Sequence, residues 1–183
     1  SLPQRASSST RRCTPTSTSW WPPRDDALVD GGLTLLPWSH VHTVPGVRED
    51  LFAASTDDRM VEWTTVPSPF TEEMLDEFLA HVPDGVFRWA LVVDARYAGN
   101  IELRLEPDGA ANFGYNTAPW ARGRGLMTRA VRLVTDHAFA RGAETLKIEM
   151  LPGNSASRHV AESNGYTFAV EHGRHLQYRR SRS

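Results

Sequence analysis

The sequence predicts an α/β (α+β) domain in which helices flank a mixed, mostly antiparallel central sheet. Three strand-like segments, at residues 87–93, 98–105 and 110–117, follow one another across short turns. A long amphipathic helix comes next, at residues 125–141. A further strand, a second helix and a hairpin then complete an alternating pattern typical of helices packed on a sheet.

Length and composition divide the chain near residue 30. A chain of 183 residues suits one domain with a single hydrophobic core. The first stretch is rich in Ser, Thr, Arg and Pro and lacks an apolar period, so we expect residues 1–30 to be a flexible tail. Trp20 and Trp21 are the side chains of this tail that could dock on the body. Residues 31–183 form the expected folded domain.

The elements that follow the tail are a short strand and two helices. Residues 33–38 have a strand-like pattern, and residues 44–55 place their apolar side chains on one side of a helix. Thr71 is a good N-cap for a second helix, whose apolar residues recur at helical spacing until Pro83. The opposite face of this helix carries four acidic residues, Glu72, Glu73, Asp76 and Glu77.

The second half of the chain continues this alternation. After the long helix, residues 145–151 predict a strand. Residues 154–164 predict a helix that Gly165 ends. Residues 166–171 and 175–180 then pair as a closing hairpin.

Charge and composition exclude several classes of function. Residues 1–24 carry four arginines and no acid, so the remainder has a net charge of about −6, which argues against a nucleic-acid binder. No apolar run is long enough to span a membrane. Cys13 is the only cysteine, which fits a reducing cytoplasm. Lys147 is the only lysine, a bias that suggests a GC-rich bacterial source.

The segment at residues 119–128 carries the clearest chemical signal. It leads from a strand through a glycine-rich loop into the long helix. Amides in the first turn of a helix lack partners within it, and the helix dipole is positive there. Such a loop favours phosphate or diphosphate, and Arg122, Arg124 and Arg129 add positive charge nearby.

Two familiar phosphate loops do not fit this segment. It lacks the Gly-Lys-Ser/Thr ending of a Walker loop, and Thr128 stands where a dinucleotide fingerprint has its third glycine. The strands that precede it also look antiparallel, unlike those of a βαβ unit. A plain flexible turn before a helix remains the alternative.

Three motifs together resemble the GNAT superfamily of N-acetyltransferases. Arg122-x-x-Gly125-x-Met127 resembles its acyl-CoA pyrophosphate loop, although Met127 replaces the usual Gly or Ala. Residues 154–166 resemble its second signature, with Ala161 where many relatives carry tyrosine. Residues 113–117 resemble its splayed central strand. The resemblance covers about residues 30–170 and is greatest to the Rim-type branch, which acetylates the N-termini of ribosomal proteins.

The resemblance implies a GNAT fold with splayed central strands and an acyl-CoA-dependent N-acyltransferase activity. An acetyl group would pass from acetyl-CoA, the cosubstrate, to a primary amine by direct attack and without a metal. The amine would belong to a protein N-terminus or a side chain. The implied cofactor-binding residues are Asn116, Thr117, Arg122, Gly123, Arg124, Gly125, Leu126, Met127 and Asn154.

Two residues are candidates for catalysis. Ser157, one helical turn after Asn154, would hydrogen-bond the departing thiolate or relay a proton to it. Glu102, on the strand before the central one, is the candidate general base, acting through water. The structural alternatives are a surface serine, a solvent-facing glutamate and, for Asn154, a helix N-cap alone.

Other functions and partners stay open at this point. One alternative is an enzyme that acylates a small amine, such as an antibiotic or polyamine, or that uses a longer acyl-CoA. Another is a non-catalytic CoA-binding sensor or interaction domain. The expected partners are acetyl-CoA and an amine acceptor, without a membrane or direct nucleic-acid contact, and a homodimer is left open. The histidines lack metal-ligand spacing, so no metal site is expected.

Overall fold

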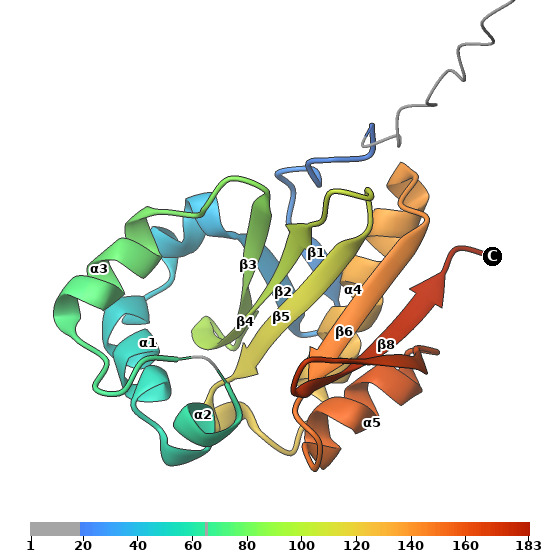
Figure 1. Cartoon of the computed structure of the whole chain (residues 1–183). Coiled ribbons are helices and arrows are strands. Elements are labelled where there is room, and N and C mark those ends of the chain that lie inside the picture. Colours follow the sequence, from blue (N-terminus) through green and yellow to red (C-terminus); the bar gives the residue numbers. More distant parts are fainter. Residues whose placement is uncertain (1–18, 65) are drawn as a thin grey trace, which may run out of the picture.

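An eight-stranded sheet organises the computed structural model, which describes residues 19–64 and 66–183. The strand order is β1-β2-β3-β4-β5-β6-β8-β7 (Figure 1). All neighbouring pairs are antiparallel except β5 and β6. The strands are β1 (Leu28–Asp30), β2 (Leu33–Pro37), β3 (Val86–Val93), β4 (Arg96–Leu105), β5 (Ala111–Thr117), β6 (Thr145–Met150), β7 (Thr167–His172) and β8 (His175–Ser181).

Helices lie on both sides of this sheet (Figure 1). The group at one side packs on β3 and β4, and α4 packs on β1, β2 and β5 with α5 beside it. The first group comprises the 3-10 helix η1 (Trp38–Thr43), α1 (Val47–Ser55), α2 (Asp58–Trp63) and α3 (Glu72–Ala80). The second comprises α4 (Leu126–Arg141) and α5 (Ser155–Ser163), and a short 3-10 helix, η2 (Pro119–Ala121), precedes α4.

The two central strands β5 and β6 separate along their length. They pair only where residues 111–113 lie beside residues 146–148, and they then diverge toward the far end of β5 (Figure 1). β4 stays paired with β5 as far as Thr117. One edge of the end of β5 therefore has no neighbouring strand, which confirms the expected splayed strands and the mixed, mostly antiparallel sheet.

Most of the elements expected from the pattern are present, within a few residues of their expected bounds. The helix expected at residues 44–55 begins at Val47, because the preceding residues form η1 and a turn. Thr71 caps α3 as expected, since its side chain accepts a hydrogen bond from the Met74 amide. The prediction missed α2, a six-residue helix too short to show an apolar period.

The expected tail boundary at residue 30 is wrong for residues 19–30, and residues 1–18 of that tail lie outside the described residues. Leu28–Asp30 forms β1 and pairs with β2. Trp20 is 2% exposed, and its indole N–H donates to the Gly109 carbonyl at 3.2 Å. Arg141 at the end of α4 donates to the Trp20 carbonyl. Burial of one large aromatic side chain thus outweighs the polar composition around it.

The core lies between the sheet and the helices on its two sides. Its largest fully buried side chains include Trp89, Tyr97, Ile101 and Leu146. None of the helices in the described residues has the length and apolar character needed to cross a membrane.

Candidate active site

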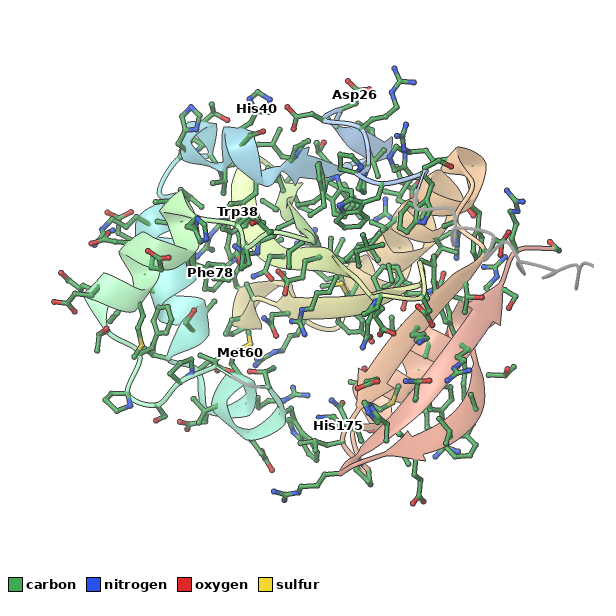
Figure 2. The ribbon with its side chains drawn as sticks, turned by 45° about the horizontal axis from the view of Figure 1, so that its top comes forward. Asp26, Trp38, His40, Met60, Phe78 and His175 are labelled. Carbon is green, nitrogen blue, oxygen red and sulfur yellow. The ribbon has the colours of Figure 1, made fainter. Side chains whose placement is uncertain are left out.

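A cleft of about 880 Å³ opens where β5 and β6 separate. Its walls come from α1, α2, β4, β5, the loop before α4, the end of β6 and the first turn of α5. Met60 of α2 and His175 of β8 both line it and lie at the same end of the molecule (Figure 2). The cleft brings together ten of the eleven site residues expected from the sequence, and Arg124 lies exposed at its edge.

The loop at residues 122–128 presents unpaired main-chain donors to this cleft. Across the described part of the chain, the amides of residues 123–128 have no hydrogen-bond acceptor. The first intrahelical bond comes later, from the Arg129 amide to the Gly125 carbonyl. Because α4 begins at Leu126, several free N–H groups gather at the positive end of its dipole. This arrangement suits a phosphate or diphosphate group.

Glycine is needed at two positions of this loop. Gly123 has φ = 76° and Gly125 has φ = 68°, both in the left-handed region that other residues rarely adopt. Gly125 is also the N-cap of α4. A Cβ atom at either position would meet no atom within 4 Å, so open space surrounds both. The glycines set the loop conformation and leave room for a ligand beside it.

The arginines around the loop are mostly neutralised by acids. Arg122 pairs with Asp57 at 2.6 Å, and Arg129 pairs with Asp30 at 2.9 Å. The hydrogen bond from Arg122 holds the pKa of Asp57 below its usual value, and the Met60 amide adds to this effect. Arg124 has no ion pair within the described residues. Main-chain donors, more than arginine charge, therefore define this end of the cleft.

The free edge of β5 offers main-chain groups at alternate residues. The Ala118 amide donates to the Ala98 carbonyl at 2.9 Å. Since alternate residues of an antiparallel pair face the same neighbour, the main chain of Asn116 points toward β4. The main-chain groups of Tyr115 and Thr117 point the other way, into the gap beside β6. Of the two residues expected to bond a ligand here, only Thr117 offers its backbone, and Asn116 lines the cleft.

The first turn of α5 lies across the gap from β5. Asn154 is its N-cap, because its Oδ1 atom accepts a hydrogen bond from the Ser157 amide at 3.2 Å. Within the described residues, the Asn154 Nδ2 group has no acceptor and remains available to a ligand. Ser157 is 9% exposed and lines the cleft. Capping and ligand binding are thus compatible for Asn154.

A hydroxyl pair bridges β5 and α5. The Tyr115 phenol oxygen lies 2.6 Å from Ser157 Oγ. Burial raises the pKa of Tyr115 to about 12, although the hydrogen bond to Ser157 acts in the opposite direction. The sequence pattern places Tyr115 on the expected central strand at residues 113–117, without a catalytic role. Its partner is 42 residues away, so no local spacing signals the pair.

Glu102 lies in the same cleft within a partly buried charge cluster. Its Oε2 accepts from Arg88 Nε at 2.9 Å, and its Oε1 accepts from Arg104 Nε and NH2 at 3.0 and 2.7 Å. The Arg88 side chain is 5% exposed and that of Arg104 is 54% exposed. A Cβ at residue 114 would lie 2.6 Å from Arg104 NH2, so Gly114 lets this pair lie flat on β5.

Aromatic rings hold the buried arginine of this cluster. The Arg88 guanidinium carbon lies 3.8 Å from the centroid of the Phe78 ring and 5.1 Å from that of Trp38. Figure 2 shows Trp38 and Phe78 close together, and their rings meet edge to face at 5.2 Å. These contacts leave Arg88 a fixed partner of Glu102, whereas the Arg104 side chain is half exposed to solvent.

Several other acidic, aromatic and histidine residues can be placed relative to the cleft. None of the acidic row on α3 lines the cleft. Trp89 is fully buried in the core, whereas Trp63 lines the cleft. His137 accepts a hydrogen bond from the Arg24 amide, and Ala161 is fully buried. Among the described residues, no group of three His, Cys, Asp or Glu side chains is placed to hold a metal ion.

Comparisons with known proteins agree with this architecture. A family model of the acetyltransferase (GNAT) domain matches residues 33–167. The RimL ribosomal L7/L12 alpha-N-protein acetyltransferase, in complex with coenzyme A, has a TM-score of 0.70 at 21% identity, covering 85% of this chain and 98% of that one. The N-acetyltransferase PseH of Campylobacter jejuni, in complex with acetyl coenzyme A, has a TM-score of 0.61 at 16% identity, covering 82% and 99%.

A third solved structure is also similar in fold. The microcin C7 self-immunity acetyltransferase MccE, in complex with acetyl-CoA and AMP, has a TM-score of 0.61 at 16% identity, covering 83% of this chain and 93% of that one. At these identities the three structures show the fold alone. A comparison with curated protein sequences finds no match. The family model spans most of the chain, so this protein belongs to the GNAT family and is an N-acetyltransferase.

Proposed function

We propose that the protein transfers an acetyl group from acetyl-CoA to a primary amine at a protein N-terminus or on a side chain. One observation carries the proposal. The unpaired amides of residues 123–128 open into a cleft that continues along the free edge of β5. A diphosphate bound at these amides would place the rest of the cofactor in the gap between β5 and β6.

The free edge of β5 supports a place for the pantetheine arm. The amide groups of the pantetheine arm can pair with the main chain of Tyr115 and Thr117, as an added strand would. Asn154 Nδ2 would hold the arm from the opposite side. A main-chain amide of β5 would donate to the thioester oxygen as charge develops on it, and one such donor is worth about 3 kcal/mol.

The Glu102 cluster supports a place for the acceptor amine on the other side of the thioester. The amine must lose a proton to attack, and Glu102 is the carboxylate that lines this part of the cleft. Both of its oxygens are already held by guanidinium groups, so the proton would pass through a water molecule. Arg104, being half exposed, is the partner that an incoming ammonium group would displace.

The chemistry then needs no covalent enzyme intermediate. The amine attacks the thioester carbon directly, and the carbon–sulfur bond breaks. Ser157 lies beside the same gap and would donate a hydrogen bond to the departing sulfur. RimL, which resembles this chain in fold, is named as an alpha-N-protein acetyltransferase, and this supports a peptide amine as the first acceptor to test.

Two measurements test this proposal in sequence. Acetyl-CoA should raise the melting temperature of the protein, as expected for a ligand that binds only the folded state. Thiol release should then be followed with acceptor peptides and with small amines such as polyamines. Faster turnover with peptides supports the proposal, whereas turnover confined to small amines would reassign the acceptor. Binding without turnover on any acceptor would indicate a CoA sensor, and no binding would refute the proposal.

A further inference from the structure

In the proposed reaction the thioester sulfur would lie beside the hydroxyl pair between β5 and α5, because both residues of the pair line the cleft. Tyr115 contributes its phenol from β5, on the edge that faces the gap. Ser157 contributes its hydroxyl from the first turn of α5. Both residues line the cleft. At 2.6 Å their oxygens form a short hydrogen bond across the entrance to the gap between β5 and β6.

The direction of this hydrogen bond follows from the chemistry of the two groups. A phenol is more acidic than an alkyl hydroxyl, so Tyr115 is the stronger donor of the pair. The alternative acceptor for the phenol is the Ser157 carbonyl, at the much longer distance of 3.5 Å. Apart from this pair, the Ser157 hydroxyl has no partner within the described residues. With Ser157 Oγ accepting from the phenol, the proton of Ser157 is left to point into the cleft.

We propose that Tyr115 is a positioning residue for acyl transfer: it donates to Ser157 Oγ and thereby aims the Ser157 proton at the sulfur of the bound thioester. This inference rests on the proposed function. A hydroxyl that accepts one hydrogen bond becomes a stronger donor in the next, because the two bonds polarise each other. The phenol thus strengthens Ser157 without touching the substrate.

The pKa values of the phenol and of a thiol decide whether the pair donates a hydrogen bond to the sulfur or transfers a proton to it. Burial raises the pKa of Tyr115 to about 12, whereas a simple thiol such as cysteine has a pKa of about 8.5. A proton moving from the phenol through Ser157 to a thiolate would therefore move uphill. The pair stays protonated and stabilises the sulfur anion by hydrogen bonding.

The bonds and protons of this step balance without a further reactant. The acceptor nitrogen bonds to the thioester carbon, the carbon–sulfur bond breaks, and its electron pair leaves on sulfur. The Ser157 hydroxyl donates to that anion while keeping its proton. The nitrogen loses two protons in all: the first passes toward Glu102 before the attack, and the second, lost as the amide forms, ends on the sulfur through water, which yields the amide and free CoA thiol.

The test uses the complex of the full chain with CoA and needs no acceptor. The thiol of bound CoA is titrated through the ultraviolet difference absorbance of its thiolate, with the protein alone as the blank because Cys13 also titrates. The pair should lower the pKa of the bound thiol below that of free CoA. Ser157→Ala and Tyr115→Phe should each raise it, with about a three- to tenfold smaller thiolate fraction at a given pH.

Tyr166→Phe is the matched control. Tyr166 forms a buried hydroxyl pair with Thr135 at 2.7 Å, yet neither residue lines the cleft. This variant should titrate like the wild type, although it loses a bond of the same kind. A double variant of Tyr115 and Ser157 should resemble Ser157→Ala alone, since Tyr115 acts through Ser157.

The outcomes distinguish a failure of the positioning role of Tyr115 from a failure of the proposed acetyltransferase function. A wild-type protein that does not bind CoA in calorimetry refutes both. Binding with an unchanged thiol pKa in Tyr115→Phe overturns the positioning role and leaves the acetyltransferase proposal intact. An additive double variant also overturns it. Once an acceptor is known, kcat should fall in Tyr115→Phe while KM for acetyl-CoA stays constant.

Discussion

The two sides of the cleft differ in the groups that they would offer to the ligands of the proposed reaction. On the donor side, at the loop 122–128, the free edge of β5 and the first turn of α5, most available groups belong to the main chain and are unpaired. On the acceptor side, around Glu102, they belong to side chains that already pair with one another. In the proposed function the donor side would therefore bind its ligand with its groups as they stand, whereas the acceptor side would first have to exchange partners.

This difference suggests which substitutions affect each side. Main-chain donors are lost only when the backbone changes or the space beside it is filled. Side-chain groups are lost by ordinary substitution, often with a cost in stability because a buried partner is left behind.

Gly125→Glu should abolish stabilisation by CoA. It fills the open space beside the loop, strains a left-handed position and adds a negative charge next to the diphosphate site. The control is Gly173→Glu, at the turn between β7 and β8, which has a similar φ of 61° and equally open surroundings. Differential scanning fluorimetry should show a CoA-dependent shift for the control only. A shift in both variants would mean that the loop is not the binding site.

Glu102→Gln should lower kcat by about a hundredfold, in the range typical of a lost general base, and leave CoA affinity unchanged. Arg88→Met breaks the same buried ion pair while it keeps the carboxylate. Both variants should lose stability, because each removes one charge of the Arg88–Glu102 pair and leaves the other without this partner. Steady-state kinetics below both melting temperatures separates the two effects. Equal losses of kcat would show that Glu102 has a structural role only.

Asn154→Ala should weaken CoA binding by about tenfold, as expected for the loss of one hydrogen bond to a buried ligand. It also removes the N-cap of α5, at a cost of about 1 kcal/mol in stability. Thr71→Ala removes the equivalent cap of α3, outside the cleft. Calorimetry should find weaker binding only for Asn154→Ala. If both variants bind CoA like the wild type, Asn154 is a cap and nothing more.

Replacing Asp57 should have the smallest effect, a change in the free energy of unfolding that depends on pH. Its pKa is lowered in the folded protein, mainly by Arg122, so its contribution is present above the unfolded pKa of about 3.9 and is lost as the pH falls through the folded value. Asp57→Asn should cost less than about 1 kcal/mol at neutral pH. Urea unfolding at pH 7 and at pH 3 checks this. A difference between variant and wild type that is as large at pH 3 as at pH 7 would contradict the assignment.

The same contrast explains how much the sequence could predict. The loop before α4 was predictable, because glycine spacing at the junction of a strand and a helix reflects main-chain geometry directly. The strands β3, β4 and β5 and the helices α4 and α5 were predictable from their periodicity. These elements place the donor side, so most of it follows from local pattern.

The acceptor side depends on contacts between distant segments. Arg88 meets Glu102 through the register of β3 and β4, and Tyr115 meets Ser157 only once α5 has packed beside β5. No local spacing encodes either pair. The six residues of α2 are too few to show a helical period, although Asp57 as an N-cap was a usable signal. The burial of Trp20 could not be predicted from the polar composition of its segment, because an average over many residues does not reveal one buried side chain.

The proposed function requires the unpaired amides of residues 123–128 to bind the diphosphate of CoA. Calorimetric titration with CoA and with pantetheine, which shares the thiol arm but lacks the diphosphate and the phosphoadenosine, tests this requirement when the wild-type protein is compared with Gly125→Glu. Two or more charged hydrogen bonds should make CoA bind at least about a hundredfold more tightly. Comparable affinities for the two ligands would contradict the claim.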